Sequence, residues 1–294
     1  MRILLCTKRD LPGCLFLNRL LPLLAGHELQ VWLSDKTRPQ EAADAVLAEI
    51  AFLERGLPID LLFPLIDALP AGTPAATQLT FTGLAQQHGV AIDAVDGVNT
   101  PAGLARLRQF GPDLLISSRF SYIFHAAAIG MPRHGVVNVH PGDLPHYAGL
   151  FAPMRMVLDG ASELCSSVHW IDQGIDTGPV LARHRQPLDR QRGLLGQISE
   201  LYCLAIPTLL TLISELAAGT RPAGEEQDIR QRHYRSLPDA AELAAFGATG
   251  MRFWSADEYR ATLQHFLPGT AAPELLNRLQ DTHWRHWLQP LLAP

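Results

Sequence analysis

The sequence predicts an α/β protein with a Rossmann-like, mostly parallel sheet, helices on both faces of it, and a small helical C-terminal region. Three observations support this class. Short apolar runs alternate with helix-like stretches through the first half of the 294 residues. Short connections containing glycine or proline join them, as in sheets built from strand–helix–strand units. Beyond about Thr220 the composition changes, through a polar linker, to short helix-like stretches.

Seven apolar runs have the length expected of buried strands. They cover residues 3–6, 29–33, 90–94, 114–117, 135–139, 166–171 and 180–187. Ligands of parallel sheets bind beyond the carboxyl ends of the strands. Polar side chains are dense at two of those ends, in residues 117–122 and 138–147. This edge of the sheet is therefore the first place to expect a functional site.

Helical spacing of apolar residues predicts helices between these strands. They cover residues 15–24, 42–54, 79–88 and 101–110. Thr100 and Pro101 supply an N-cap and a first-turn proline, and Gly89 and Gly111 supply helix ends. Residues 194–216 form one long apolar stretch that Pro207 kinks or breaks.

The C-terminal region carries its own helix signals. Ser255 and Glu258 have the spacing of a capping box, with Trp254 and Tyr259 as a hydrophobic staple. A last predicted helix places four residues on one face: Leu276, Leu279, His283 and Trp287. We predict a catalytic domain over residues 1–218 and a linker with a small helical region over residues 219–294. The tail, with Trp254, Trp284 and Trp287, is interpreted as cover for the sheet or as a homodimer surface.

Composition excludes several classes of protein. A hydrophobic share of 47% supports a sizeable core, and a formal net charge of −5 argues against broad nucleic-acid or anionic membrane binding. The four cysteines, Cys6, Cys14, Cys165 and Cys203, have no C-x-x-C spacing and are expected as free thiols. Lys8, Arg9 and Asp10 interrupt the first apolar run, and we identify no membrane-spanning stretch. A cytoplasmic protein with no membrane partner is predicted.

Asn138 and His140 form the first chemical constellation. Side chains alternate along a strand, so both point to the same face at the end of the run 135–139. The turn Pro141-Gly142-Asp143-Leu144-Pro145 follows and fixes the pair. The alternative is that nearby backbone groups merely satisfy both side chains.

The second constellation is Gly174-Ile175-Asp176-Thr177-Gly178, in which two glycines bracket an acid between two predicted strands. By itself this pattern is also typical of a glycine-rich turn whose aspartate bonds its own backbone. His134, His140 and His146 are spaced by six residues, as metal ligands on an extended chain could be. The turn after His140 breaks that extension, so no metal is predicted.

Together, VNVHPGDLPHYAG and SSVHWIDQGIDTGPVL resemble the folate-dependent formyltransferases. That family includes glycinamide ribonucleotide formyltransferase, methionyl-tRNA formyltransferase and the sugar N-formyltransferases. Its pattern is Asn-x-His, then Leu-Pro, then Gly-(Leu/Ile/Val)-Asp-(Thr/Ala)-Gly. Asn138, His140 and Asp176 fall in register with the Asn-His-Asp triad of the family. The resemblance runs from Met1 to about Pro187 and leaves the tail uncovered.

The resemblance implies a reaction and a donor. Asn138 would donate a hydrogen bond to the oxyanion, His140 would also move a proton, and Asp176 would hold the imidazole. The formyl donor would be 10-formyltetrahydrofolate, and no metal is needed. The residues implied to wall or read the folate are Arg119, Phe120, Ser121 and Tyr122, with Gln173, Gly174 and Ile175.

Two departures from the family pattern concern the acceptor. Gly142 and Asp143 stand where Ser and Leu are frequent, and Ala148 stands where Arg is frequent. Asp143 is expected to face a cationic or polyhydroxylated acceptor. The tail from Ser236 has four Arg, no Lys and six acids, which is poorly suited to binding phosphates.

We therefore predict a small-molecule amine as acceptor and no nucleic-acid partner. An amino sugar, or an amino acid such as an N-hydroxy-ornithine-like amine, fits, as found in surface glycans and siderophores. Two alternatives stay open. One is a formyltetrahydrofolate hydrolase, which uses water as acceptor at the same site. The other is a catalytically idle folate-binding module.

Overall fold

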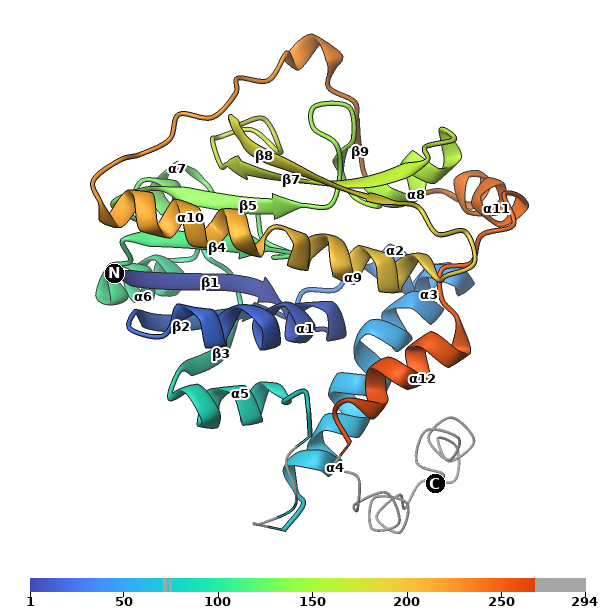
Figure 1. Cartoon of the computed structure of the whole chain (residues 1–294), viewed down its shortest axis with the longest axis horizontal. Helices are drawn as coiled ribbons and strands as arrows, with labels where there is room; N and C mark the ends of the chain where they lie inside the picture. Colours follow the sequence, from blue (N-terminus) through green and yellow to red (C-terminus); the bar gives the residue numbers. More distant parts are fainter. Residues whose placement is uncertain (71–72, 74–75, 268–294) are drawn as a thin grey trace.

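The computed structural model describes residues 1–70, 73 and 76–267. A seven-stranded sheet runs through the molecule in the order β3-β2-β1-β4-β5-β7-β8 (Figure 1). Its strands are β1 (Arg2–Lys8), β2 (Glu28–Ser34), β3 (Ala91–Val95), β4 (Leu114–Ser118), β5 (Val136–His140), β7 (Glu163–Trp170) and β8 (Val180–Pro187). The strands from β3 to β5 are parallel, while β7 and β8 are antiparallel to their neighbours. The predicted fold class is confirmed.

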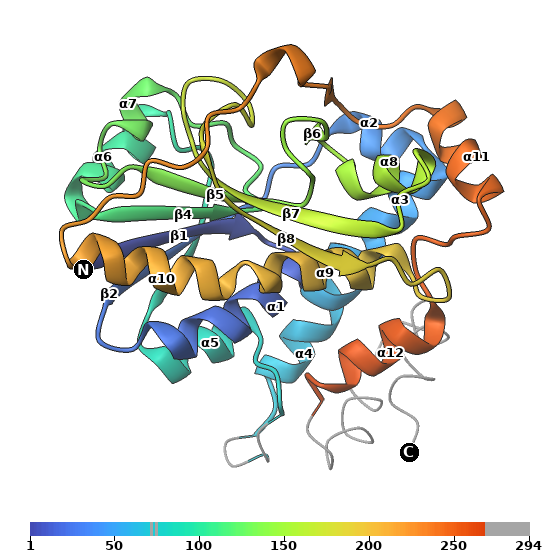
Figure 2. The same ribbon diagram turned by 45° about the horizontal axis from the view of Figure 1, so that its top comes forward.

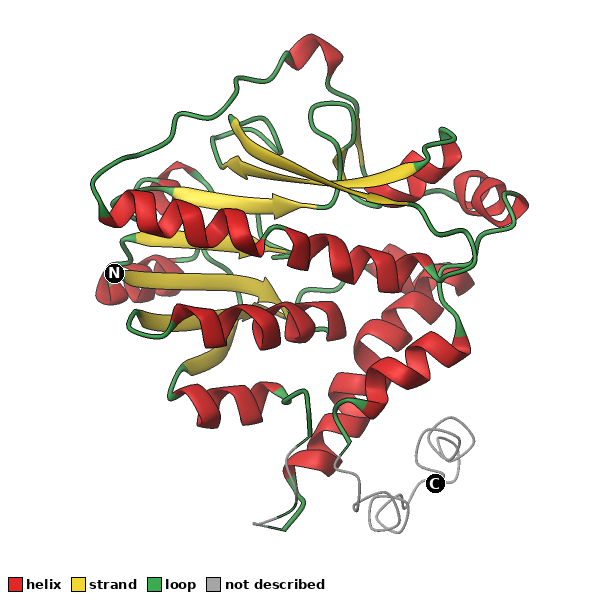
Figure 3. Ribbon diagram, viewed as in Figure 1, coloured by secondary structure: helices red, strands yellow, loops and turns green. Residues whose placement is uncertain are grey.

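Helices cover both faces of the sheet (Figure 3). The α-helices are α1 (Leu11–Leu20), α2 (Pro39–Ala43), α3 (Ala45–Ala51), α4 (Phe63–Asp67), α5 (Phe81–His88), α6 (Pro101–Phe110), α7 (Ala126–Ile129), α8 (Ala152–Leu158), α9 (Leu194–Leu204), α10 (Ile206–Ala217), α11 (Ala240–Ala248) and α12 (Ala256–Gln264). The others are the 3-10 turns η1 (Leu21–Leu24) and η3 (Ile229–Gln231) and the π-helix η2 (Phe52–Leu62).

Alternation along the strands divides the core into two layers. Ile3 and Leu5 of β1 join the larger cluster, into which α1, α5, α9 and α10 pack. Leu4 and Cys6 point the other way, toward α6 and α7. A strand that is buried on both faces consists of a continuous run of apolar residues, and this is why β1 and β4 could be predicted from the sequence.

The cap signals of two helices are also confirmed. The Thr100 side chain accepts the Gly103 N–H at the start of α6, and Gly111 ends that helix in the left-handed region. Gly89 ends α5 in the same way. The long apolar stretch divides into α9 and α10 at Ala205, just before Pro207.

The segment just before α4 and the C-terminal signals differ in part from expectation. Residues 52–62 continue as a π-helix through Gly56 and Pro58, instead of ending near Glu54. The predicted capping box at Ser255 is wrong, because Glu258 bonds Arg192 and the Gly193 N–H instead. The staple is present, with the Trp254 and Tyr259 rings 6.1 Å apart. The predicted face formed by Leu276, Leu279, His283 and Trp287 lies outside the described residues.

After α10 the chain crosses the top of the molecule in Figure 1 before it reaches α11. Residues 225–235, which we call the strap, contain η3 and the short strand β9 (Tyr234–Arg235). Strand β9 pairs in parallel with β6 (Ala148–Gly149) in a separate two-stranded sheet, and Figure 2 shows β6 above β7 in that view. The strap therefore touches the half of the chain that carries both sequence motifs.

Within the part of the chain that the structure describes, one segment is long and apolar enough to cross a membrane by length and composition, namely Leu194–Ala217, which combines α9 and α10. From the sequence we had expected no such stretch. Leu201, Leu209 and Ile213 of this segment are buried in the larger core cluster. It therefore has the character of a core helix pair, with one face packed against the sheet.

Candidate active site

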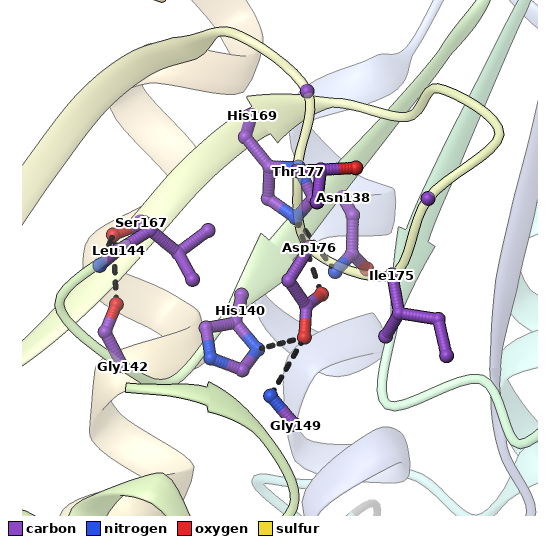
Figure 4. A network of polar contacts seen from close by, with 12 residues as sticks. Asn138, His140, Gly142, Leu144, Gly149, Ser167, His169, Ile175, Asp176 and Thr177 are labelled. Carbon is purple, nitrogen blue, oxygen red and sulfur yellow. Dashed lines mark hydrogen bonds and ion pairs between the residues drawn. The ribbon is translucent and has the colours of Figure 1, made fainter. Parts of the chain in front are cut away.

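A cavity of about 320 Å³ opens at the carboxyl ends of β4 and β5, and Asn138, His140 and Asp176 all line it. Asn138 and His140 come from β5, and Asp176 comes from the loop between β7 and β8. Figure 4 shows the three side chains converging. The structure thus brings together three residues that span 38 positions of the sequence, from Asn138 to Asp176.

His140 is buried between two acceptors. Its Nε2 lies 2.6 Å from the Tyr147 carbonyl oxygen, so this nitrogen carries a proton and donates it. Its Nδ1 lies 3.7 Å from Asp176 Oδ2. With both nitrogens facing oxygen, the protonated ring has a partner at each N–H. The site is therefore built to accommodate an imidazolium.

Asp176 is held in an unusual backbone conformation. Its φ is +55°, in the left-handed region that costs a residue with a Cβ about 1–3 kcal/mol. The Gly149 N–H donates to Oδ2 over 2.8 Å. Burial alone would raise the pKa of Asp176, but the charges of His140 and His169 and the Gly149 hydrogen bond outweigh it. The pKa therefore lies below its ordinary value, and the carboxylate is ionised at neutral pH.

His169 is a fourth member of the site that the sequence analysis did not identify. Its Nε2 lies 3.6 Å from Asp176 Oδ1, and its Nδ1 donates to the Trp170 carbonyl over 2.8 Å. Burial lowers the pKa of His169, so the ring is neutral at neutral pH. The pairing of β5 with β7 brings His169 directly opposite Asn138, a contact between distant segments that no local sequence pattern marks.

The neutral His169 ring orients Asn138. With Nδ1 carrying the proton, Nε2 is an acceptor, and Asn138 Nδ2 donates to it over 3.2 Å. An amide nitrogen has two N–H bonds, so the second is free for a group in the cavity. Asn138 is thus presented as a fixed donor.

Most, but not all, of the residues implied to contact folate line the cavity. Phe120, Ser121, Tyr122, Gly174 and Ile175 line the cavity. Gln173 is exposed and is not among the residues that line it. The ring of Phe120 stacks on that of Phe124, with centroids 5.5 Å apart, which gives this wall a flat aromatic surface.

Arg119 also borders the cavity, but its guanidinium is already occupied. It donates two hydrogen bonds to Asp10, at 3.0 and 2.7 Å, and one to Glu54 at 2.8 Å. Asp10 is fully buried, so it needs this partner. The Arg119 guanidinium is therefore part of a structural ion-pair cluster at the border of the cavity, and its contact with folate stays a prediction.

Asp143 is not among the residues that line the cavity, and its contact with an acceptor stays a prediction. Its carboxylate lies 2.7 Å from Arg185 and 3.4 Å from Arg183, two arginines of β8. Among the described residues, no group of three or more His, Cys, Asp or Glu is placed to hold a metal ion. His134, His140 and His146 do not come together, and Cys6, Cys14, Cys165 and Cys203 are free thiols.

The rest of the cavity wall is largely apolar. Leu47 and Ile50 of α3 and Ile198 of α9 line it. Lys8 and Glu54 also border it. Burial and the nearby Asp10 carboxylate raise the pKa of Glu54, whereas Arg119 and Lys8 oppose that rise.

The fold and this site resemble those of the folate-dependent formyltransferases. Residues 85–194 match the formyl transferase family, a span that contains Asn138, His140, His169 and Asp176. The resemblance predicted from the two motifs is thereby confirmed.

Particular relatives fall into two groups. Among curated proteins, methionyl-tRNA formyltransferases are similar to this chain. That of Xanthomonas campestris pv. campestris is 30% identical over 179 residues, covering 59% of this chain and 57% of its own. That of Syntrophomonas wolfei is 28% identical over 153 residues, covering 51% and 48%. The chain thus spans about half the length of the curated relatives it matches.

Solved structures share the fold at low identity. A 4-N formyltransferase from Francisella tularensis has a TM-score of 0.55 at 11% identity, covering 85% of this chain and 88% of its own. An N-formyltransferase from Helicobacter canadensis, solved with folinic acid and dTDP-3-aminofucose, has a TM-score of 0.54 at 14% identity, covering 87% and 81%.

Proposed function

We propose that this protein transfers a formyl group from 10-formyltetrahydrofolate to the amino group of a small molecule. The observation that carries the proposal is the convergence of Asn138, His140 and Asp176 in one cavity. Asp176 lies within 4 Å of both His140 and His169, a spacing at which its charge acts on the imidazoles.

The cavity offers a fit for the donor on one wall. Phe120, Tyr122 and Phe124 form an aromatic cluster that matches a flat heterocycle. Gly174 and Ile175 also line the cavity and bring backbone groups to it. The bound folate would supply an activated formyl group, and these residues would orient it toward Asn138.

The chain's own residues supply the remaining chemistry. The free amide N–H of Asn138 stabilises negative charge that develops on the formyl oxygen, an effect worth about 3–4 kcal/mol. His140 passes a proton between the attacking amine and the leaving nitrogen. Asp176, ionised because its pKa is lowered, holds the imidazolium that forms.

The acceptor proposed is a small amine, either an amino sugar or an amino acid such as an N-hydroxy-ornithine-like amine. The apolar wall of Leu47, Ile50 and Ile198 supports an acceptor small enough to enter the cavity. The acidic tail provides few cations for a phosphate backbone. Transfer RNA is the second candidate, because the curated relatives reported above act on methionyl-tRNA by name.

We place this reaction in the cytoplasm, which the four free thiols support because thiols persist in reducing compartments. The division at residue 218 and a homodimer formed through the C-terminal region stay predictions. Most of that region's final part lies outside the described residues.

The test is a discontinuous assay with 10-formyltetrahydrofolate that measures both tetrahydrofolate release and formylated product. Amino sugars, ornithine-type amines and charged initiator tRNA are compared as acceptors. We expect transfer to a small amine. Efficient formylation of the tRNA, lost steeply on adding salt, would assign the second candidate. Formate release without any acceptor would indicate a hydrolase, and folate binding without turnover would indicate an idle module.

A further inference from the structure

The loop that carries Asp176 is fastened to the strap, residues 225–235. The Gln227 side-chain amide donates to the carbonyl oxygens of Asp176, at 3.1 Å, and Gly178, at 2.7 Å. Arg232 donates twice to the Ile175 carbonyl, from Nε at 3.2 Å and from Nη2 at 2.6 Å. The three carbonyls that flank and include the aspartate are thus held from one side.

The same strap also holds the strand on the other side of the carboxylate. Ala148 donates its N–H to the His233 carbonyl at 3.2 Å, and Leu150 donates to the Arg235 carbonyl at 2.8 Å. Between these two lies Gly149, whose N–H binds Asp176 Oδ2. Just before Ala148 lies Tyr147, whose carbonyl accepts from His140. The strap therefore connects the partners of both Asp176 and His140.

Asp176 needs such a restraint because its backbone is in the left-handed region, where a residue with a Cβ is strained. Hydrogen bonds to the carbonyls of residues 175, 176 and 178 oppose relaxation of the loop toward an ordinary conformation. Gln227 and Arg232 donate their hydrogen bonds to backbone carbonyls and not to the carboxylate itself. Gln227 therefore acts on the carboxylate through the backbone, while Arg232 also lowers the pKa of Asp176 by its charge.

We propose that Gln227 and Arg232 are positioning residues, which hold Asp176 at its working distance from His140 and His169. This rests on the proposed formyl transfer for its kinetic consequence only. The strap lies outside residues 85–194, the span that matches the formyl transferase family, so that span by itself contains only part of the working site.

The variants are Gln227→Ala and Arg232→Lys. The second keeps the positive charge but loses the two-pronged reach to Ile175. The matched controls are Gln231→Ala and Arg230→Lys, because these two side chains lie on the same strap and bond only Asp228. Arg230 is 89% exposed. Thermal unfolding of all four proteins sets an assay temperature at which each is folded.

Two readouts separate positioning from a general loss of stability. The first is kinetic: we expect kcat to fall about 10- to 100-fold, with the KM for the folate donor little changed. The second is the pKa of the Asp176 carboxyl, followed by carbon NMR. It should move up toward its ordinary value in Gln227→Ala, because the loop relaxes and the carboxylate moves away from His140, His169 and the Gly149 N–H, which lower its pKa. Both controls should match the wild type.

A double-variant cycle completes the test. If Gln227 acts through Asp176, then Gln227→Ala should cause no further loss of turnover in an Asp176→Asn background. An unmoved Asp176 pKa in folded Gln227→Ala and Arg232→Lys proteins would overturn the proposal, as would additive losses in the cycle. The carboxyl titration needs no turnover. It therefore decides this inference even if the proposed formyl transfer fails.

Discussion

The Asp176 carboxylate divides its two oxygens among three partners. Oδ2 serves the Gly149 N–H and faces His140, while Oδ1 faces His169. The two imidazoles thereby differ in role although they share one counter-charge. His140 lies between two oxygens that can accept hydrogen bonds from its protonated ring. His169 is buried in its neutral form, and its Nε2 accepts a hydrogen bond from Asn138.

Each triad side chain should be indispensable for turnover but not for the fold. We expect Asn138→Ala, His140→Ala and Asp176→Ala each to lower kcat by at least about 100-fold, since each removes charge stabilisation at the reacting atoms. Circular dichroism and thermal unfolding check that the variants stay folded. Near wild-type turnover in a folded His140→Ala protein would refute the proposed mechanism.

The neutral state of His169 predicts a pH dependence of stability. Burial lowers its pKa in the folded protein, so between that value and about 6.5 the unfolded chain binds more protons. The free energy of unfolding should therefore fall as the pH drops below about 6.5. His27 and His184 have lowered pKa values too and contribute in the same direction.

The part due to His169 is isolated with His169→Gln. Urea unfolding at several pH values between 5 and 7.5 should give a shallower decline for this variant than for the wild type. Equal slopes in the two proteins would mean that His169 is not held neutral by the fold.

At the scale of elements, a strand was easier to predict from the sequence when both of its faces are buried. β1 and β4 are buried on both faces and were predicted as apolar runs, and β8 was predicted with its observed bounds, Val180–Pro187. The π-helix η2 could not be predicted from the sequence. The residues around Gly56 by themselves indicate a helix end, and the contacts that continue the helix come from a distant segment. The packing that overrides it comes from α12, where the Tyr259 hydroxyl donates to the Leu53 carbonyl over 2.8 Å.

Helices α8 and α11 are joined by a buried ion pair that should be costly to break. Arg155 donates from Nε and Nη2 to the two Glu242 oxygens, at 2.9 Å each, and from Nη1 to the Leu150 and Ser236 carbonyls. Arg155→Ala leaves these acceptors unpaired and should cost about 2 kcal/mol of unfolding free energy. Glu242 is partly exposed, which limits the loss.

Chemical denaturation measures this loss. Arg230→Ala, at an exposed arginine of the strap, is the control and should leave the unfolding free energy unchanged within experimental error. Equal stability of Arg155→Ala and the wild type would show that α11 is held by its apolar contacts alone.

At the scale of the whole molecule, the sheet order brings the two motifs together. The sequence predicted this convergence, because Asn138, His140 and Asp176 come from signals within single segments. It could not predict that the Arg119 side chain turns to Asp10 and Glu54, which lie 109 and 65 residues away in the chain. The contacts of the strap could not be predicted either, because they join segments that are distant in the sequence and no local sequence pattern marks them.

Donor binding should stabilise the whole fold. Folinic acid, which cannot serve as the 10-formyl donor, should raise the melting temperature, since a ligand that binds only the folded state at 100 times its Kd adds about 2.7 kcal/mol. Differential scanning fluorimetry and calorimetry measure the effect. Absence of both a thermal shift and binding heat at saturating folate would exclude the proposed donor, most plainly if a formyl coenzyme A did bind.

The position of the strap in the chain has a consequence for biosynthesis. Gln227 follows Asp176 by 51 residues, and ribosomes add about 5–20 residues per second. For roughly 3 to 10 s after Asp176 is polymerised, the segment that will restrain it does not yet exist. During this interval a nascent chain can form the parallel sheet, but the loop that carries Asp176 is not yet held by the strap. Catalytic competence is thus among the last properties this polypeptide acquires as it is made.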